Sequence, residues 1–443
     1  MKKKFLFAIA LCMPLHSLAA DLMDVFRQAL VSDPTYQQAI SQRLSTREGV
    51  PISLAGLLPS ASITGQGPNI TRIAASGSAS TNTTTTQRGY NVTLNLSQTV
   101  FDFSQFAGLA SANALAKGAD ATLSAATQNL MIRVTSAYFN ILKDQDNLVY
   151  IKSTRTAYAK QLEQVTQQYR VGLKTVTDVY TARASYETSV ANYIAAEATL
   201  ATDKENLRAI TGILYPFLAR LRDNFPLLKP QPANIDNWVR TAGKQNWSIK
   251  TAQYSANSYR DIIKQQWGGH LPTLNIQGSY ENNYYNSSNG SILVSGNGSS
   301  RTQTTLATLN LNIPLVQGGL VVAETNQAKY NYEVAIQQLE LQLRSTFTQT
   351  RQNYLNVVAG ISKIAADKQS IKSNISSLHG MEAEYRVGTE ILVNVLNQQQ
   401  NVYQAQQQYA SDRYAYVNNL LALKQAAGTL SQQDLEAINS WLE

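Results

Sequence analysis

Two stretches of the chain alternate apolar and polar side chains with a period of two residues. In residues 304–315 the odd positions are mostly apolar and the even ones mostly polar, and residues 90–100 alternate in the same way. This period predicts β-strands with one apolar and one polar face, and about ten residues are enough for a tilted strand to cross a bilayer. A weaker candidate strand precedes each of them, beginning at Leu58 and at Leu271.

Low-complexity segments of small polar residues, 74–89 and 286–302, separate the paired strands. Such segments cannot form a core, so we expect exposed loops on two β-hairpins. A soluble β-sandwich would also use hairpins, but the long helical tracts between these two argue against it. Four strands are too few to close a membrane barrel, for which about eight is the minimum, so closure requires other chains.

Four long tracts favour α-helix because they are rich in Ala, Leu and Gln and poor in proline. They are residues 105–170, 176–210, 322–386 and 391–426. At about 1.5 Å per residue, the first would be roughly 100 Å long. Apolar positions recur at mixed three- and four-residue steps, which indicates coiled-coil packing on neighbouring helices rather than a globular core.

The chain is a tandem duplication. The segment "QQYRVGLKTVTDV" from Gln167 recurs as "AEYRVGTEILVNV" from Ala383, and at the same shift Gly212 falls on Gly428. Each Tyr-Arg-Val-Gly phrase would end one long helix and begin a turn, for which glycine supplies the permissive backbone. The predicted domains are a leader at 1–20, a first repeat at 21–230, and a second repeat with a C-terminal equatorial segment at 231–443.

The chain starts with the features of a secretory leader. Three lysines at positions 2 to 4 precede the apolar run "FLFAIALCMPL" and the small residues "SLAAD", so we expect a signal peptide cleaved after Ala20. An uncleaved anchor is the alternative, but the run is far shorter than the roughly 20 residues of a spanning helix. Cys12, the only cysteine, would leave with the leader, so the mature chain would hold no disulfide. The bulky Leu11 disfavours acylation of Cys12 in a lipoprotein.

The charge balance argues weakly against nucleic acid as a partner. Removing the three leader lysines from the formal net charge of +8 leaves +5, spread along the chain without a basic block. Only 15% of the residues are charged, which is low for a soluble domain and suits a wall that faces a solvated lumen or a partner subunit. After the leader no apolar run reaches the length of a spanning helix. An exported chain of this kind is either soluble or crosses a membrane with strands.

Nothing in the sequence indicates catalysis, a metal or a cofactor. Of the three histidines, His16 lies in the leader, and neither His270 nor His379 has neighbours at the spacing of a metal site or a catalytic triad. His270, between "WGG" and "LP", is better placed to mark a helix-to-strand turn. No Walker loop or nucleophile elbow is present. We therefore expect a protein that is not an enzyme.

The helix-ending motifs carry a specific resemblance. The segments "KQLEQVTQQYRVGLKTVTDV" and "EYRVGTEILVNVLN", with the junction "LSQTVFDFS" from Leu96, resemble the TolC family of outer-membrane efflux and secretion channels over essentially the whole mature chain. The resemblance implies a mixed α+β membrane protein. Its homotrimer would share one β-barrel, with four strands per chain, continued by a long α-helical coiled-coil barrel. Residues 214–238 and the segment after Gly428 would form an equatorial belt.

The resemblance also implies an exit duct in the outer membrane of a Gram-negative cell, with its helical part in the periplasm. Its partners would be a periplasmic adaptor protein, an inner-membrane efflux pump or ABC transporter, and outer-membrane lipid, without nucleic acid. Export of drugs or other small molecules is the first expectation, and dedicated type I secretion of a protein or peptide is the second. The third is a non-conducting coiled-coil surface or adhesion trimer, against which the alternating strands and duplicated turns argue.

In the family, polar links between helices near the turns close the periplasmic entrance. By resemblance, the gate candidates are Gln161, Thr177, Asp178 and Tyr385. The first and last of them are also plausible as ordinary helix-packing residues. Where the family often has an arginine that bridges to the Asp178 position, this chain has Glu390, and two acids would repel. Either Lys174, the repeat equivalent of Glu390, or Arg386, one turn earlier, could supply the cation.

The constriction departs from the family pattern. Aspartates three residues apart often line it, whereas this chain has Asn394 and Asn397. Threefold symmetry would turn each carboxylate into a ring that favours cations, and an amide ring lacks that charge. This departure from the family pattern predicts weaker cation selectivity and weaker block by multivalent cations.

The turns themselves are the expected docking sites for the adaptor. By resemblance, adaptor tips would dock in grooves marked by Gly172, Leu173, Gly388 and Thr389. The two glycines would cap helices in any case, so the structural and the docking roles are compatible.

Overall fold

A computed structural model describes residues 19–67, 69–75, 82–289 and 298–443 of the chain. The leader up to Leu18, with Cys12 and His16, lies outside the described residues, and so do parts of both predicted loops. The chain forms two compact units, and each draws on both repeats. The sheet unit comprises Ser41–Thr122 and Lys250–Gln342, and the helical unit comprises Met1–Ile40, Leu123–Ile249 and Leu343–Glu443.

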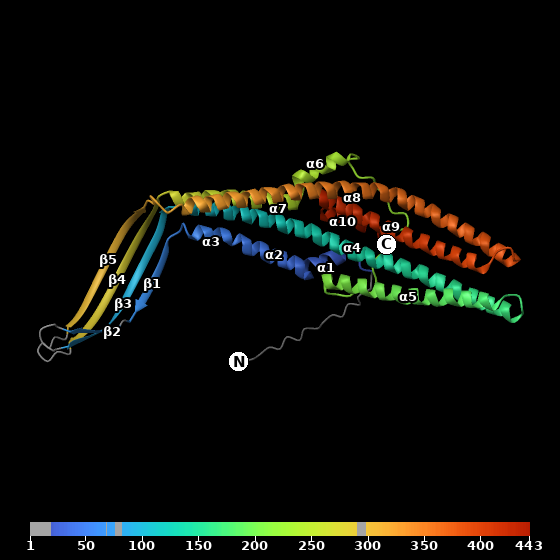
Figure 1. Cartoon of the computed structure of the whole chain (residues 1–443), viewed down its shortest axis with the longest axis horizontal. Helices are drawn as coiled ribbons and strands as arrows, with labels where there is room; N and C mark the ends of the chain where they lie inside the picture. Colours follow the sequence, from blue (N-terminus) through green and yellow to red (C-terminus); the bar gives the residue numbers. More distant parts are fainter. Residues whose placement is uncertain (1–18, 68, 76–81, 290–297) are drawn as a thin grey trace, which may run out of the picture. The chain divides into compact units, whose positions relative to one another are not determined.

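The sheet unit holds an antiparallel sheet whose strands come from both repeats (Figure 1). Its strands are β1 (Ser60–Gln66), β2 (Asn69–Ala75), β3 (Asn82–Phe101), β4 (Thr273–Asn289) and β5 (Gly298–Asn312). β1 and β2 pair with successive parts of β3, and β4 lies between β3 and β5, so four strand positions lie side by side as predicted. The predicted strand 304–315 was too long at its end: β5 stops at Asn312, because Pro314 has no N–H to donate to a ladder. The predicted loops 74–89 and 286–302 were wrong in part: residues 82–89, 286–289 and 298–302 belong to β3, β4 and β5, because pairing with neighbouring strands overrides their low β-propensity.

The strand register separates apolar from polar side chains. Directly opposite residues point to the same face, and Leu94 lies opposite Tyr280. The apolar face carries Ile63, Leu94, Leu96, Ile276, Tyr280, Leu309 and Leu311, all of them exposed in this chain. On the other face, the carboxylate of Glu281 accepts hydrogen bonds from the side chains of Asn91 (2.8 Å) and Asn283 (2.7 Å). The alternating pattern thus yields a sheet with two chemically different faces.

Four of the helices in the described residues are long. The helices are α1 (Leu22–Ser32), α2 (Pro34–Arg47), α3 (Gly49–Ala55), α4 (Phe103–Arg170), α5 (Val176–Thr211), α6 (Ile235–Gln245), α7 (Trp247–Trp267), α8 (Leu320–Val387), α9 (Leu392–Ala427) and α10 (Gln432–Asn439), with a short 3-10 helix η1 (Gly268–His270). α4, α5, α8 and α9 begin and end within two residues of the predicted tracts. Among the described residues, no helix is both long and apolar enough to span a membrane.

Helices meet the sheet at defined junctions. Asp102 caps α4, because its carboxylate accepts hydrogen bonds from two backbone N–H groups of the first helical turn. Phe103 packs edge-on against Trp267 at the end of α7, with the ring centroids 6.0 Å apart. η1 then leads into β4, which confirms the helix-to-strand turn predicted at His270.

The core of the helical unit gathers the N-terminal, middle and C-terminal parts of the chain. Its largest fully buried side chains include Leu22, Phe26, Leu130, Tyr138, Phe139, Tyr416, Leu421 and Leu423. Two isolated bridges support this core, a parallel one between Ala20 and Leu218 and an antiparallel one between Leu221 and Leu442. The segments expected to form the equatorial belt therefore pack on the same core as α1 and the middle of α4.

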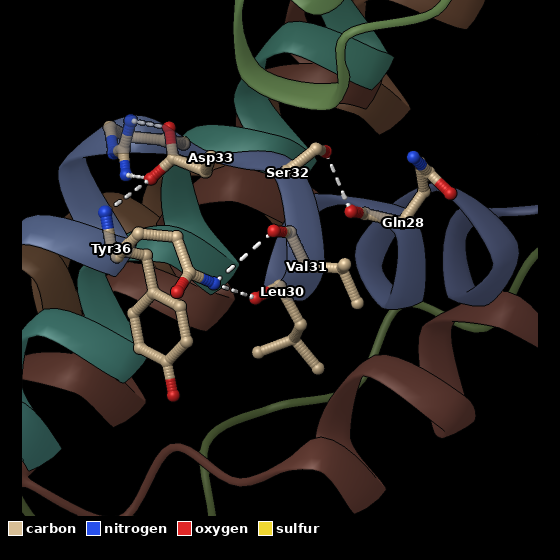
Figure 2. A network of polar contacts seen from close by, with 8 residues as sticks. Gln28, Leu30, Val31, Ser32, Asp33 and Tyr36 are labelled. Atoms are coloured by element: carbon tan, nitrogen blue, oxygen red, sulfur yellow. Dashed lines mark hydrogen bonds and ion pairs between the residues drawn. The ribbon is translucent and has the colours of Figure 1, made fainter. Parts of the chain in front are cut away.

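A buried ion pair fixes the link between α1 and α2 (Figure 2). Asp33 is 2% exposed, and Arg133 from α4 donates to both of its carboxylate oxygens, at 3.2 and 2.5 Å. The N–H of Tyr36 donates to the same carboxylate (2.8 Å), so Asp33 also caps α2. Burial alone would raise the pKa of Asp33, but hydrogen bonds from Arg133 and Tyr36 and the charge of Arg133 together lower it.

Candidate functional site

The two copies of the Tyr-Arg-Val-Gly motif form equivalent turns in the helical unit. In each copy, the glycine N–H donates to the carbonyl three residues earlier, and the N–H of the next residue, Leu173 or Thr389, donates to the carbonyl five residues earlier. This pair of hydrogen bonds is the Schellman motif that ends a helix. It requires a left-handed backbone, which Gly172 (φ 78°) and Gly388 (φ 87°) adopt without steric cost.

The helices that follow the two turns are capped differently. α5 begins with a capping box, in which Asp178 accepts from the N–H of Thr175 (3.0 Å) and the Thr175 hydroxyl accepts from the N–H of Asp178 (3.2 Å). In the second copy, Ile391 occupies the N-cap position and offers no capping side chain. There Glu390 accepts from the N–H of Ile391 and from the side chain of Asn394, both at 2.7 Å. These two hydrogen bonds lower the pKa of Glu390.

A cation–π contact joins the two copies. The Nζ atom of Lys174, in the first turn, lies 4.1 Å from the ring centroid of Tyr385, near the end of α8. Tyr385 is 6% exposed and lies in a cluster contributed by all four long helices. The other buried members are Tyr158, Val165, Val179, Ala182, Leu392, Val395 and Leu396. The Tyr385 hydroxyl and the side-chain nitrogen of Gln161 are buried without a hydrogen-bond partner, which costs free energy in this arrangement.

The remaining gate candidates lie around this contact. The hydrogen bonds of Asp178 and Glu390 described above stay within their own turns. Nε of Arg386 donates to the carbonyl of Glu382 one turn earlier (3.3 Å), and Thr177 is exposed in the first turn of α5. Of the two cations considered from the sequence, Lys174 is therefore the one described in contact with a gate candidate.

The two constriction candidates face different surroundings. Asn394 and Asn397 are both exposed in the first turns of α9. Asn394 is bound to Glu390, whereas Asn397 lines a cavity of about 260 Å³ between α4, α5 and α9. The cavity wall is neutral and includes Tyr158 and Tyr403.

Exposed apolar side chains surround both turns. Leu173, a predicted docking residue, is 72% exposed. Val171, Val387 and Ile391 beside the turns are also exposed, although sequence reasoning did not select them. The Val-Gly step shared by the two copies was the signal that could have identified Val171 and Val387. Clustered exposed apolar groups are typical of surfaces that bind other proteins.

Two aspartate pairs between helices were not anticipated. Asp144 of α4, 5% exposed, neighbours Asp203 of α5, and Asp367 of α8 neighbours Asp412 of α9. Burial first, and the neighbouring carboxyl second, raise the pKa of Asp144 and that of Asp367 to about 6. Lys143, whose Nζ lies 3.6 Å from Asp144, offsets part of this effect. The partners are far apart in sequence, so no local motif could have revealed either pair.

The described residues contain no group of three or more His, Cys, Asp or Glu side chains that could hold a metal ion. The imidazole of His379 lies on the exposed surface of α8, with Nδ1 3.7 Å from a carboxylate oxygen of Glu382.

A known family model matches the chain twice, once in each copy of the duplication. The family model described as "Outer membrane efflux protein" matches residues 25–213 and 238–429. The chain is 36% identical to outer membrane protein TolC of Escherichia coli K12, over 96% of this chain and 86% of that protein. It is 27% identical to the proteases secretion protein PrtF of Dickeya chrysanthemi, over 96% of this chain and 92% of that protein. The crystal structure of the CmeC outer membrane channel of Campylobacter jejuni shares the fold, with a TM-score of 0.77 at 17% identity, over 95% of this chain and 90% of that one.

Proposed function

Because the chain belongs to the outer membrane efflux protein family, we infer that it is the outer-membrane exit duct of a tripartite efflux system. It lies in the outer membrane, with its long helices in the periplasm, and acts with adaptor proteins and inner-membrane pumps. The observation that carries this function is the two-faced sheet in a chain that also forms two equivalent helical turns. Such a chain has an apolar surface for lipid, a polar surface for water and two equivalent turns to which a partner protein could bind.

The sheet faces suggest how the duct is assembled. The apolar face, with Leu94 and Leu309, would contact outer-membrane lipid, and the polar face, with Glu281, would line the lumen. β1 and β2 form one edge of the described sheet and β5 forms the other, and backbone groups at a sheet edge can pair with another chain. A homotrimer in which the sheets of three copies pair edge to edge would satisfy both edges.

The contact of Lys174 with Tyr385 is our leading candidate for the resting latch of the periplasmic entrance. It holds the first turn against the end of α8, and the unpaired Tyr385 hydroxyl and Gln161 amide favour a rearrangement that would pair them. The other gate candidates are Thr177, Asp178, Arg386 and Glu390. An adaptor that binds one arrangement of the turns more tightly than the other would shift the population of open entrances.

In the proposed homotrimer, Asn394 and Asn397 would form rings of uncharged amides at the constriction. The exposed groups at the turns would receive the adaptor, because apolar side chains surround the two turn glycines. This surface consists of Gly172, Leu173, Gly388 and Thr389, together with Val171, Val387 and Ile391.

Dedicated secretion of a protein is the second candidate function. It draws support from the similarity to the proteases secretion protein PrtF, but the chain is less identical to that protein than to the TolC channel, 27% against 36%. Efflux is therefore favoured. A non-conducting adhesion trimer is the least favoured reading, since it would need no polar lumen.

Conductance of the purified protein in planar lipid bilayers tests the duct directly. Insertion should produce discrete ion-conducting steps that are the same in size from one event to the next. A protein that inserts into the bilayer and gives no steps would contradict the duct and support a non-conducting trimer.

A further inference from the structure

Ala20 is hydrogen-bonded into the core of the helical unit. Its N–H donates to the carbonyl of Phe217 (3.0 Å), and its own carbonyl accepts from the N–H of Ala219 (3.1 Å) and from the hydroxyl of Tyr138 (3.1 Å). It thereby forms the parallel bridge with Leu218. The Tyr138 hydroxyl shares its one proton with the carbonyl of Ala219 (2.8 Å), so the two backbone hydrogen bonds are what make Ala20 part of the folded protein, whereas Ala19 before it is exposed.

The segment that receives Ala20 also binds the C-terminal end of the chain. Arg220 and Glu443 exchange two backbone hydrogen bonds, at 2.9 and 2.8 Å, and the N–H of Arg222 donates to the carbonyl of Trp441 (3.0 Å). Residues 217–222 are thus held by Ala20 at one end and by the C-terminal residues at the other. A chain that began at Asp21 would lose the first support and leave the Ala219 N–H and the Phe217 carbonyl without these partners.

The residues before Ala20 favour cleavage after Ala19 over cleavage after Ala20, the site first expected from the run of small residues. Leader cleavage sites carry small residues at the first and third positions before the cut. A cut after Ala19 places Ala19 and Ser17 at these positions, and both are small. A cut after Ala20 places the bulky Leu18 at the third position.

We propose that a signal peptidase hydrolyses the Ala19–Ala20 peptide bond, so that Ala20 is the first residue of the mature protein. Water adds across the amide: Ala19 leaves with the leader as a carboxylate, and Ala20 gains an α-amino group. At neutral pH this amine is mostly protonated. The resulting ammonium retains a proton for the Phe217 carbonyl, so the cut preserves the hydrogen bond seen in the fold.

The N-terminal sequence and intact mass of protein purified from outer membranes test the site. The expected sequence is Ala-Asp-Leu-Met, starting at Ala20. A start at Asp21, at any later residue or at Met1 would overturn the proposal.

Processing of two matched precursor variants distinguishes a cut after Ala19 from a cut after Ala20. Ala19→Phe puts a bulky residue directly before the proposed cut and should accumulate uncleaved precursor. Ala20→Phe lies after that cut and should be processed like the wild type, whether or not the released chain folds. The opposite result would place the cut after Ala20 instead.

The anchoring role of Ala20 can be measured on mature protein. Deleting Ala20 leaves the proposed cut after Ala19 intact but starts the chain at Asp21. The matched variant Ala20→Gly keeps every backbone hydrogen bond of the residue. The deletion should lower the Tm relative to Ala20→Gly, and equal Tm values would show that Ala20 does not anchor the fold.

Discussion

Lys174 places its ammonium group 4.1 Å from the ring centroid of Tyr385, although the two residues belong to different repeats. The first turn is thereby tied to the end of α8 by one flexible side chain. The sequence offered Lys174 and Arg386 as cations for the gate, and of the two Lys174 is the one described against the ring of Tyr385. Since Tyr385 is buried among residues of all four long helices, displacement of this ring would disturb both helical hairpins.

Replacing Lys174 by alanine should therefore favour the open entrance. A cation–π contact contributes about 0.5–1 kcal/mol or more, so three copies in the proposed homotrimer would shift the equilibrium at least roughly tenfold. Single-channel conductance in lipid bilayers and leakage of a large antibiotic into cells should both rise. Lys174→Arg, which keeps a cation over the ring, should behave like the wild type. Unchanged conductance of the alanine variant would exclude Lys174 as the latch.

Replacing Asn397 by aspartate should make the duct more selective for cations, because three symmetric carboxylates would form a charged ring. The reversal potential in a potassium chloride gradient should shift toward the potassium potential. Asn397 is the cleaner position, since Asn394 donates to Glu390 and an aspartate there would repel that acid. We therefore expect Asn394→Asp to shift selectivity and also to weaken the start of α9. An unchanged reversal potential in both variants would remove these residues from the constriction.

The turn glycines should resist replacement by alanine for backbone reasons alone. A Cβ atom on Gly172 or Gly388 would meet nothing within 4 Å, but both residues have positive φ, which costs an L-residue about 1–2 kcal/mol. Thermal unfolding should detect this loss. Gly380, inside α8, is the matched control: it also has open space, and alanine there should stabilise by up to about 1 kcal/mol. If all three variants had the same Tm, the left-handed turns would not be required.

Stability of the helical unit should fall as the pH rises through about 6. Burial and the neighbouring Asp203 raise the pKa of Asp144 to about 6, so the folded protein holds this proton more tightly than the unfolded chain. The stabilisation is complete below the ordinary carboxyl pKa of about 4 and is lost as the pH passes 6. Asp144→Asn should flatten the dependence of Tm on pH between 5 and 7.

The second pair provides an internal check, because the pKa of Asp367 beside Asp412 is raised in the same direction, again to about 6. Asp144→Asn combined with Asp367→Asn should flatten the pH dependence more than either change alone. A pH dependence identical to that of the wild type would show that the pairs do not share a proton.

The buried carboxylate of Asp33 depends on Arg133. Arg133→Met would leave the carboxylate of Asp33, which is 2% exposed, without its cation and should destabilise the protein. Asp33→Asn together with Arg133→Met should recover part of that loss, because asparagine keeps the cap of α2 without the charge. Chemical unfolding of the wild type and of the two variants measures both effects. Equal stability of the single and double variants would contradict a charge-dependent cost.

The long helices and their glycine turns were predictable because their signals are local. Composition favoured helix, and a repeated glycine marked each end. Pro314 was a local signal too, and reading it would have ended β5 correctly at Asn312. The contact of Lys174 with Tyr385 was not predictable, because it depends on how two hairpins pack.

Ala20 illustrates a different limit. The spacing of small residues favours a cut after Ala19, whereas the hydrogen bonds of Ala20 form only once residues 217–219 are folded beside it. The two compact units were not predictable for the same reason. Each combines segments that lie far apart in the sequence and meet only in the folded chain.

Export by this chain is tested most directly by the accumulation of a fluorescent efflux dye in living cells. The dye would be measured in the parent strain, in a strain that lacks the gene, and in that strain with the wild-type gene restored. If the chain is the exit duct for small molecules, deletion raises intracellular dye and restoration returns it to the parental level. Unchanged accumulation after deletion would contradict efflux, and a protein missing from the culture medium of the same strain would then identify a secretion substrate.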